Sequence, residues 1–598
     1  MEIKQKKRDE ISAQYKWRLE DIFSSQDEWQ KAVDALPAKI AEVTAFQGKL
    51  TNGENILACF KALDEAETAF GFIFVYGNMK LHEDTNISAS QGMADVAQGQ
   101  MAKFYAEIAF IDPEILSLDE KDIKKFIAET PGLELYDHFL DSTLRRKAHV
   151  LSTEIEAILA SSQEVISAPS NIRDMLADAD LKFGNVEDED GNNLELTHGR
   201  YLSLLQSKDR SVRENAFNMY YDGYWKMKNT LAALLNSSIK GDIFIARTRK
   251  YDSARSAALS QNNIPLSVYD NLISAVHEYL PVFHRYLAMR KKALKLDELH
   301  IYDLYCPYIE EADTNMPYEE AKKKLIEGLA PLGKDYLDDM AKGIDGGWID
   351  VYENEGKNSG AYSWGSYGTH PYVLMNYEDK LGDLFTFAHE MGHAMHSYYT
   401  RKTQPKVYGN YPIFLAEVAS TVNETLLMEH MLKTTDDKNV RAYLIGEYLD
   451  QFRTTVFRQT MFAEFEMILH SMAEEGKPLT LEVINKIYRD LNVKYYGADF
   501  VVDEKLDLEW ARISHFYRAF YVYQYATGYS AAIAFTKRIK EMGEPAVKDY
   551  LGFLKSGNSE YPIDTLKKAG VDMESPTPVR DALKVFEELV VQLEKEYA

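Results

Sequence analysis

Apolar residues recur at helical spacing through most of this chain. Pairs and groups of them stand three to four positions apart, as at Tyr201, Leu202, Leu204, Leu205, Leu231, Leu234 and Leu235. Spacing of this kind places apolar side chains on one face of an α-helix. Proline, which disrupts helices, occurs only 17 times in 598 residues. The pattern therefore predicts a mainly α-helical protein.

Two segments depart from this pattern and predict short strands. Residues 181–196 contain the turn sequence Asp-Glu-Asp-Gly-Asn, flanked by residues that suit a β-hairpin. Residues 345–377 are rich in Gly, Ser, Tyr and Trp, which is typical of loops and strands. We therefore expect a mainly α fold with a small β element that precedes the helix carrying the chemistry described below.

The chain is too long for one ordinary core, and its length indicates roughly two to four domains. No linker rich in Pro, Gly or Ser marks a junction between them. We place a soft boundary near residue 200. Residues 1–200 are expected to form a helical N-terminal domain that supplies part of a channel wall, and residues 201–598 a catalytic domain that shares an interface with it.

Charge and composition exclude several classes of function. The formal net charge is −26, which repels phosphate backbones and anionic lipids and argues against nucleic-acid and membrane partners. The longest strongly apolar run, residues 70–77, is far shorter than the roughly 20 residues of a membrane span. The N-terminus carries positive charge without an apolar stretch after it, so no secretory signal is expected. Cys59 and Cys306 cannot form a disulfide framework for this length of chain, which predicts a reducing, cytoplasmic location.

The sequence His-Glu-Met-Gly-His, which begins at His389, matches the pattern H-E-x-x-H. Residues four positions apart lie one above the other on a helix, so the imidazoles of His389 and His393 can reach one metal ion. Glu390 points to the adjacent side, where it can hold a zinc-bound water and take its proton. Gly392 lowers helix propensity by about 1 kcal/mol. We expect it to serve close packing at a crowded site.

A catalytic zinc needs a third protein ligand and one open position. Three ligands on one helix would crowd a tetrahedral ion, so His396 is expected in the core or behind the ligands. Residues 412–427 predict a second helix, on which Glu417 and Glu424 share one face. A carboxylate on an otherwise apolar helix is costly unless it is paired or bound to metal. We therefore expect Glu417 to be the third ligand and Glu424 to orient a ligand histidine.

The sequence resembles a known family, the oligoendopeptidase F branch of the thimet oligopeptidase-like zinc metallopeptidases. The similar stretches span essentially the whole chain and include residues 387–427, SGAYSWGSYGTHPYVLMNY (359–377), NNIPLSVYDNLI (262–273) and HFYRAFYVYQYATG (515–528). The resemblance implies a mostly helical, two-lobed peptidase with a deep central channel and one Zn2+ per chain, which cuts internal bonds of short unstructured peptides. The family's zinc ligands fall on His389, His393 and Glu417, and its base falls on Glu390.

Residues 514–529 offer donors for the oxyanion that develops during peptide hydrolysis. Tyr517, Tyr521 and Tyr525 repeat every four residues and are predicted to line one helix face, with His515 at its start. Such a stripe is more often core packing. The resemblance implies a histidine and tyrosines that bind the carbonyl, and these map best onto His515, Tyr521 and Tyr525. Tyr517 and Tyr529 stay open as alternatives.

The segment ahead of the predicted metal helix is expected to bind substrate. Gly360, Ala361 and Tyr362 suit an edge strand that an extended peptide can join by backbone pairing. The resemblance implies that this region contacts the peptide, with His370 near the reaction. The alternative for His370 is an ordinary loop histidine before Pro371.

Two other classes of function stay open beside the peptidase. One is a peptide-binding or chaperone-like protein without turnover, against which an intact Glu390 argues. The other is a helical scaffold that carries H-E-x-x-H by chance. A near match to a phosphate-binding loop at residues 328–335 is rejected, because Asp335 stands where Ser or Thr is needed, and a helix end is expected there. The sequence predicts no oligomeric state.

Overall fold

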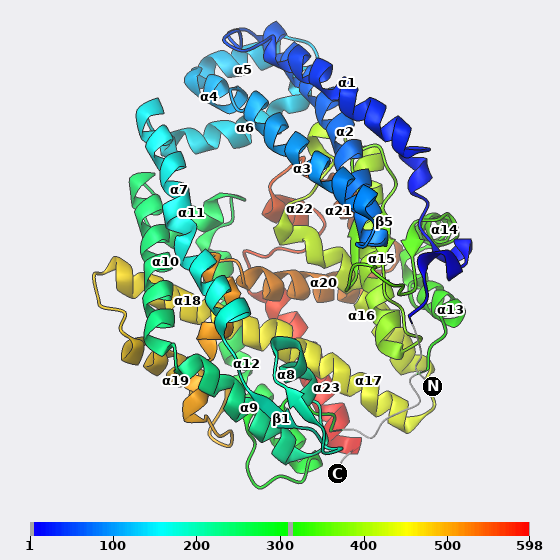
Figure 1. Ribbon diagram of the computed structural model, residues 1–598, viewed down its shortest axis with the longest axis vertical. Helices are drawn as coiled ribbons and strands as arrows, with labels where there is room; N and C mark the ends of the chain where they lie inside the picture. The colour runs from blue at the N-terminus through cyan, green and yellow to red at the C-terminus, as the bar shows by residue number, and fades with distance from the viewer. Residues whose placement is uncertain (1–4, 309–314, 597–598) are drawn as a thin grey trace. The chain divides into compact units, whose positions relative to one another are not determined.

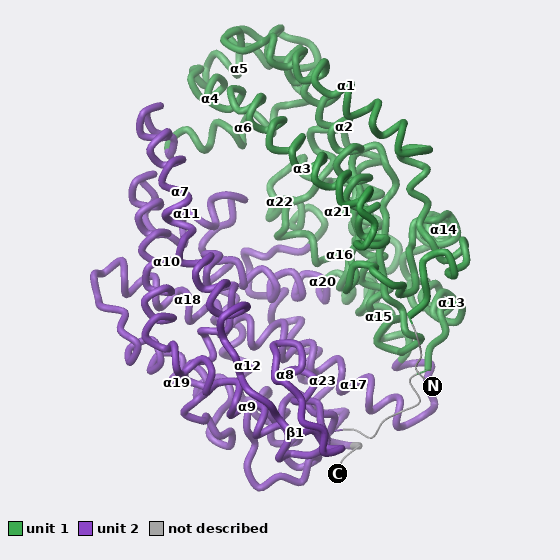
Figure 2. Tube along the Cα trace, in the orientation of Figure 1, with its two compact units in different colours: residues 1–148, 314–431, 535–570 green, residues 149–313, 432–534, 571–598 purple. Residues whose placement is uncertain are grey.

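The computed structural model describes residues 5–308 and 315–596, and most of them are helical (Figure 1). The chain forms two compact units, each assembled from three separate segments (Figure 2). Unit 1 comprises residues 1–148, 314–431 and 535–570, and unit 2 comprises residues 149–313, 432–534 and 571–598. The mainly α fold predicted from the sequence is confirmed.

The first segment of unit 1 is a layer of helices in which α1, α2 and α3 pack side by side. The helices of this segment are α1 (Gln26–Thr44), α2 (Gly53–Glu83), α3 (Ser88–Ile108), α4 (Ile111–Ser117), α5 (Glu120–Glu129) and α6 (Asp137–Arg145). In their common core the indole of Trp29 donates a hydrogen bond to the carbonyl of Ile73 (3.0 Å). Tyr372 and Leu374 of a small sheet reach the same core, so the sheet and the helical layer pack as one body.

The other segments of unit 1 hold this sheet and the helices beside it. Their elements are α13 (Tyr318–Gly328), α14 (Lys334–Asp345), β3 (Ile349–Asp350), β4 (Tyr362–Trp364), β5 (Tyr372–Leu374), α15 (Leu381–Thr403), α16 (Ile413–Thr434, whose last residues belong to unit 2), α21 (Glu544–Ser556) and α22 (Pro562–Lys568). The central strand β5 pairs in parallel with β3 and antiparallel with β4. β4 is therefore an edge strand, and the β element precedes α15 as the sequence predicted.

Unit 2 is a helical unit with one short hairpin. Its elements are α7 (Thr153–Asp174), β1 (Asn185–Glu187), β2 (Asn193–Glu195), α8 (His198–Leu204), α9 (Arg210–Trp225), α10 (Lys228–Thr248), α11 (Ala254–Ser260), α12 (Leu266–Ala293), α17 (Lys438–Phe452), α18 (Arg458–Glu474), α19 (Leu481–Tyr496) and α23 (Thr577–Glu596). Helix α20 (Tyr523–Met542) begins in unit 2 and ends in unit 1. β1 and β2 pair antiparallel, with Val186 opposite Leu194, which confirms the predicted hairpin.

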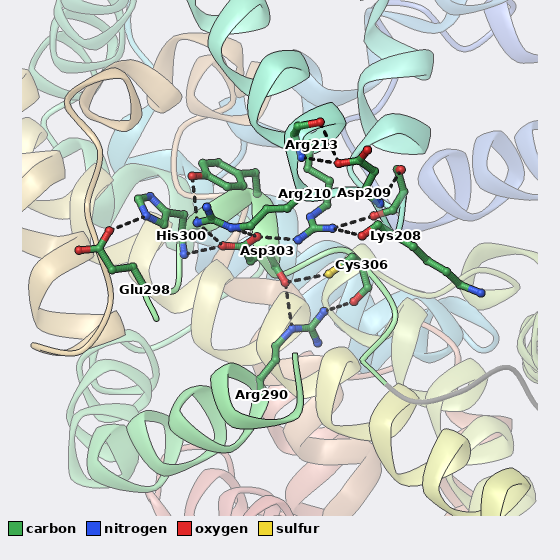
Figure 3. A network of polar contacts seen from close by, with 12 residues as sticks. Lys208, Asp209, Arg210, Arg213, Arg290, Glu298, His300, Asp303 and Cys306 are labelled. Carbon is green, nitrogen blue, oxygen red and sulfur yellow. Dashed lines mark hydrogen bonds and ion pairs between the residues drawn. The ribbon is translucent and has the colours of Figure 1, made fainter. Parts of the chain in front are cut away.

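A network around the buried residue Asp303 ties α9, α12 and the segment after α12 together inside unit 2 (Figure 3). Asp303 is fully buried and accepts hydrogen bonds from Arg213 (2.8 Å) and Arg210 (3.2 Å). Arg290 donates to the backbone carbonyls of Asp303 (3.3 Å) and Cys306 (2.6 Å). A buried charge is tolerated only with partners of this kind, so the network fixes the position of this segment.

The compact units follow a different division from the boundary predicted near residue 200. Each unit joins segments that lie far apart in the sequence, which a single linear boundary does not describe. The division into residues 1–200 and 201–598 stays a prediction. The segment around Asp335 is confirmed as a helix end, because α13 stops at Gly328 and α14 starts at Lys334. Among the described helices, none combines the length and the hydropathy that a membrane crossing requires.

Candidate metal centre

The helix that carries H-E-x-x-H is buried on several sides. Leu384, Phe387, Ala388 and Met395 of α15 are all inaccessible to solvent. The N-terminus of the helix is capped by Asp383. Its carboxylate accepts hydrogen bonds from the backbone N–H groups of residues 378 and 380 (2.8 and 3.1 Å). α15 is therefore a rigid, internal support for the residues that it presents.

Gly392 is the point at which α16 comes closest to α15. A Cβ atom at this position would lie 2.5 Å from the Cα of Ser420 and 2.6 Å from the carbonyl oxygen of Ala419. Both are backbone atoms, which cannot move aside without shifting the helix. The glycine thus serves close packing, as expected from the sequence. This approach lets Glu417, one turn before Ser420, face the two histidines of α15.

Three donor atoms meet between the two helices. The Nε2 atoms of His389 and His393 are 3.1 Å apart, and Glu417 Oε2 lies 3.4 Å from the first and 3.6 Å from the second. A tetrahedral zinc ion with bonds of about 2.0–2.1 Å places its ligands about 3.3–3.4 Å from one another. The triangle therefore has the size that a tetrahedral ion needs, and the described residues of the chain hold no other such group.

A second carboxylate sets the tautomer of one histidine. Glu424 Oε1 lies 3.1 Å from Nδ1 of His389. When Nδ1–H donates to Glu424, Nε2 keeps its lone pair for a metal ion. His393 makes a hydrogen bond with the backbone of Ala416, which orients its ring as well. Both imidazoles are thus held in place from behind.

The electrostatics of the group favour a cation. Burial opposes the charged form of His389, yet the carboxylates of Glu417 and Glu424 raise its pKa to about 10. Burial and the neighbouring His389 lower the pKa of His393 to about 4. Burial also opposes the ionised form of Glu417, but the two histidines lower its pKa to about 2. A negative carboxylate beside two facing imidazoles is a donor set that suits a divalent metal ion.

Glu390 lies beside these donors with a free carboxylate oxygen. The residue is 6% exposed, and its Oε2 atom has no hydrogen-bond partner among the residues that the structure describes. The carboxylate also makes a hydrogen bond with the backbone of Ser363 in the edge strand β4. Burial, with a smaller contribution from Glu417 and Glu424, raises the pKa of Glu390 to about 7. Such a group can take up and release a proton near neutral pH.

His396 is a core residue and lies outside the donor group. It is fully buried and stacks on Tyr411, with ring centroids 3.7 Å apart and an interplanar angle of 4°. Burial lowers its pKa to about 3, so the ring is neutral. The core is one of the two positions that the sequence predicted for His396.

The prediction of one helix through residues 514–529 is wrong. Ser514–Tyr517 is a short 3-10 helix (η12), and α20 begins only at Tyr523. Between them Phe520 adopts a left-handed backbone conformation (φ +56°). Its N–H donates to the buried carboxylate of Glu466 on α18 (2.6 Å). The four-residue spacing of the tyrosines was therefore not helical periodicity, because a turn at Phe520 separates η12 from α20.

This turn gathers His515, Tyr521 and Tyr525 into one cluster in unit 2. The phenolic oxygen of Tyr525 lies 3.3 Å from Nε2 of His515, and the three ring centroids are 5.5–5.9 Å apart. Tyr517 is not part of the cluster, because its hydroxyl lies near Arg173, and Tyr529 is buried beside Gln451 (3.4 Å). Sequence reasoning missed Glu466. This residue stands in the apolar stretch of residues 461–469, and a carboxylate in an apolar stretch is the same signal that drew attention to Glu417.

The predicted substrate segment lies at the sheet edge of unit 1. Gly360 and Ala361 lead into β4, and Gly360 has φ +82°, which favours glycine. The hydroxyl of Tyr362 contacts Nδ1 of His82 (2.6 Å), so its side chain is engaged within the unit. His370 is engaged too, with Asp21 (3.1 Å) at Nε2 and its own neighbour's carbonyl at Nδ1. The side chains of Tyr362 and His370 are thus engaged within unit 1, and the backbone of β4 forms an edge of the sheet.

Comparison with known proteins decides the family. The sequence profile described as "Peptidase family M3" matches residues 203–585, and that described as "Oligopeptidase F" matches residues 114–183. The chain belongs to peptidase family M3. It is therefore a metal-dependent endopeptidase, and the resemblance to oligoendopeptidase F seen in the sequence is confirmed.

Individual relatives of this M3 peptidase match over nearly their whole length. Oligopeptidase PepF from Bacillus subtilis is 48% identical over 98% of this chain and 88% of its own. Group B oligopeptidase PepB from Streptococcus agalactiae is 42% identical over 98% of both chains. The crystal structure of oligoendopeptidase-F from Enterococcus faecium is 38% identical, with a TM-score of 0.74 over 95% of this chain and 98% of that one.

The M3 match includes all of the candidate residues in α15 and α16 as well as the cluster around His515. The metal dependence of the family agrees with a donor group of His389, His393 and Glu417 that could hold an ion. The substrate segment at Gly360 also falls within the match. The donor group of unit 1 is thus a candidate for the metal site that the family requires.

Proposed function

We propose that this M3 peptidase is a zinc-dependent oligoendopeptidase, which hydrolyses internal bonds of short, unstructured peptides in the cytoplasm. The observation that carries the proposal is the triangle of donor atoms from His389, His393 and Glu417. The names of the relatives, which are oligopeptidases and oligoendopeptidases, support the substrate class. Two buried free thiols, Cys59 and Cys306, support a reducing compartment.

One zinc ion per chain is held by these three residues, and Glu424 maintains the tautomer of His389. The spacing of the donors supports zinc, because it fits tetrahedral bonds to nitrogen and oxygen. Zinc bound there supplies Lewis acidity, which makes water at the site more acidic and polarises a carbonyl. The carboxylate of Glu417 neutralises part of the charge of the ion.

Glu390 is the general base. Its free Oε2 atom takes a proton from the attacking water, and the protonated carboxyl then passes this proton to the amine that leaves. Burial supports this role because it raises the pKa of Glu390 to about 7. A group with a pKa near neutrality can accept a proton as a base and then donate it as an acid. The bond from the Ser363 backbone keeps the carboxylate beside β4.

Peptide substrate is proposed to join the edge strand β4 by backbone pairing, near Gly360, Ala361 and Tyr362. Such pairing holds an extended chain with little dependence on its side chains. His515, Tyr521 and Tyr525 are proposed to donate hydrogen bonds to the carbonyl oxygen as it gains negative charge. Their mutual contacts support a common role. Tyr517 and His370, which are engaged elsewhere, are proposed only to support substrate binding.

Metal analysis combined with one substitution tests the proposal. We expect one zinc per purified chain, loss of peptide cleavage on chelation and recovery on adding zinc. Glu390→Gln should retain zinc and lose most turnover, because it keeps the shape of the side chain and removes its basicity. Glu54→Gln, an exposed change of the same kind, is the control.

Two results would contradict the proposal. A protein that binds peptides but cleaves none with zinc present would be a peptide-binding protein. A Glu390→Gln variant that keeps more than about a tenth of the wild-type kcat, a loss of about 1.4 kcal/mol, would remove Glu390 as the base.

A further inference from the structure

A surface pocket of about 560 Å³ opens beside His515. Its walls come from α7, α8, α9 and residues 512–518, all of which belong to unit 2. Its lining holds three arginines, Arg173, Arg512 and Arg518, with His198 and His515 beside them, against two carboxylates, Asp174 and Asp178. This excess of arginine contrasts with the chain as a whole, whose net charge is −26 because acidic residues outnumber basic ones.

Arg512 brings an excess of positive charge to the pocket. Its guanidinium shares the buried carboxylate of Glu509 (3.3 Å) with Arg458, which lies closer to the same oxygen (2.6 Å). Burial opposes the ionised form of Glu509, but the two arginines lower its pKa to about 2, so the carboxylate is fully charged. Two guanidinium groups thus share one carboxylate, and among the described residues no second carboxylate pairs with either of them. Only Arg512 of the two lines the pocket, and its Nε–H donates to the hydroxyl of Tyr221 (3.1 Å).

Arg173 is fixed rigidly in the pocket wall. It is 5% exposed and donates to the backbone carbonyl of Arg512 (2.7 Å) and to the carboxylate of Asp174 (2.9 Å). Its Nε atom is buried without a hydrogen-bond partner in the part of the chain that the structure describes. Of the two acidic residues of the pocket, Asp174 pairs with Arg173, and Asp178 lies 3.7 Å from His198 with a largely exposed side chain.

Arg518 is the most accessible of these cations. Its side chain is exposed, and no carboxylate among the described residues lies within ion-pairing distance. The positive charge of Arg518 also acts on His515. Burial lowers the pKa of His515, and the charges of Arg518 and Arg173 lower this pKa further. The pocket is thus electropositive at the edge that it shares with His515.

We propose that this pocket binds a carboxylate group of the peptide substrate, with Arg518 and Arg512 as the groups that recognise it. A guanidinium presents paired N–H donors that match the two oxygens of a carboxylate. The carboxylate is either the C-terminal group of a short peptide or the side chain of an aspartate or glutamate near the cut bond. The inference rests on the proposed function, because His515 is what relates the pocket to the reaction.

Paired peptides test this inference. One pair has the same sequence with a C-terminal acid or a C-terminal amide, and a second pair has an amidated end with Glu or Gln beside the cleavage site. For wild-type enzyme we expect the acid member of one pair to have a kcat/KM about tenfold or more above its neutral partner, the range of a hydrogen bond to a charged group. The pair that shows the effect identifies the source of the carboxylate.

Substitutions then assign the effect to the pocket. Arg518→Gln should bring the ratio of acid to neutral peptide towards one, and Arg518→Lys should keep part of it. Arg580→Gln, which removes an arginine of α23 outside the pocket, should keep all of it. Peptide binding gives a second readout that does not need turnover. Dissociation constants of the same peptides are measured for zinc-loaded Glu390→Gln and for the double variant that also carries Arg518→Gln.

Each outcome separates this inference from the proposed function. A wild-type ratio near one in both pairs, or an unchanged ratio in Arg518→Gln, overturns the inference while cleavage itself stands. Absence of cleavage by the zinc-loaded wild type overturns the proposed function. The ratio of dissociation constants for acid and neutral peptides then tests by itself whether the pocket binds a carboxylate. A preference for the acid peptide in binding that Arg518→Gln removes supports it.

Discussion

Glu424 contacts His389 but is not one of the three facing donors, so its effect on the metal is indirect. We expect Glu424→Gln to weaken zinc binding about 10- to 100-fold, because the amide is a weaker acceptor for Nδ1–H and no longer offsets the charge of the ion. Competition with a chelator of known affinity measures the change. Glu429→Gln, on the same helix but paired with Lys540, is the matched control. Equal zinc affinity in both variants would show that Glu424 does not support the ligand.

Gly392 shows how a single absent methyl group determines the approach of two helices. We expect Gly392→Ala to lower the free energy of unfolding by about 1–3 kcal/mol, because its Cβ would overlap backbone atoms of α16. Zinc content should fall with it, since Glu417 would be displaced. Gly382→Ala, also in α15, has nothing within 4 Å of its Cβ and should be neutral or stabilising. Thermal unfolding of both variants checks this, and similar melting temperatures would contradict the packing argument.

At the scale of elements, helices were more predictable than turns. α15, α16 and the β1–β2 hairpin follow from local patterns, because the apolar face or the turn residues lie within a few positions of one another. The turn at Phe520 does not, since its left-handed conformation depends on Glu466, a residue of another helix. Tyr521 and Tyr525 lie beside His515, but not on the single helix that their spacing predicted, and their role stays a prediction.

The Glu466 anchor should make stability depend on pH. Burial raises the pKa of Glu466 to about 8, against about 4.3 in an unfolded chain. Between these values the folded protein holds a proton that the unfolded chain has lost, so the free energy of unfolding falls as pH rises. The charged groups that face it are His470, which lowers its pKa, and Asp242, which raises it.

Glu466→Gln should remove this dependence. The melting temperature of the variant, taken relative to wild type, should therefore rise steadily between about pH 5 and pH 8. Glu475→Gln, an exposed change just after the end of α18, is the control and should show no such trend. A constant difference between Glu466→Gln and wild type would mean that Glu466 is ionised in the folded protein throughout this range.

At the scale of the whole molecule, the sequence indicated the family but not the arrangement of the units. Residues 1–148 and 535–570 belong to one unit because of contacts between positions hundreds of residues apart, and no local pattern encodes such pairings. The candidate metal group escaped this difficulty, since His389 and His393 are four residues apart. Glu417, which the structure brings to the two histidines, drew attention because a carboxylate stood out on an apolar helix.

Substrate size is also a property of the whole molecule. We expect cleavage of unstructured peptides and none of stable folded proteins, because pairing with β4 requires an extended chain and unfolding a domain costs about 5–15 kcal/mol. Mass spectrometry of products can compare one disulfide-bonded protein in its native and its reduced, unfolded states. Equal digestion of the two would contradict the size limit.

The segmented construction of unit 1 has a consequence for its synthesis. Helix α15 packs against α21, and Thr400 donates a hydrogen bond to the carbonyl of Leu554 (2.9 Å). A ribosome adds residues in order, so His389, His393 and Glu417 emerge long before the helix that covers α15 exists. The nascent chain therefore carries its proposed metal ligands through the synthesis of residues 432–534, the middle segment of unit 2, and unit 1 can close around them only when translation is almost complete.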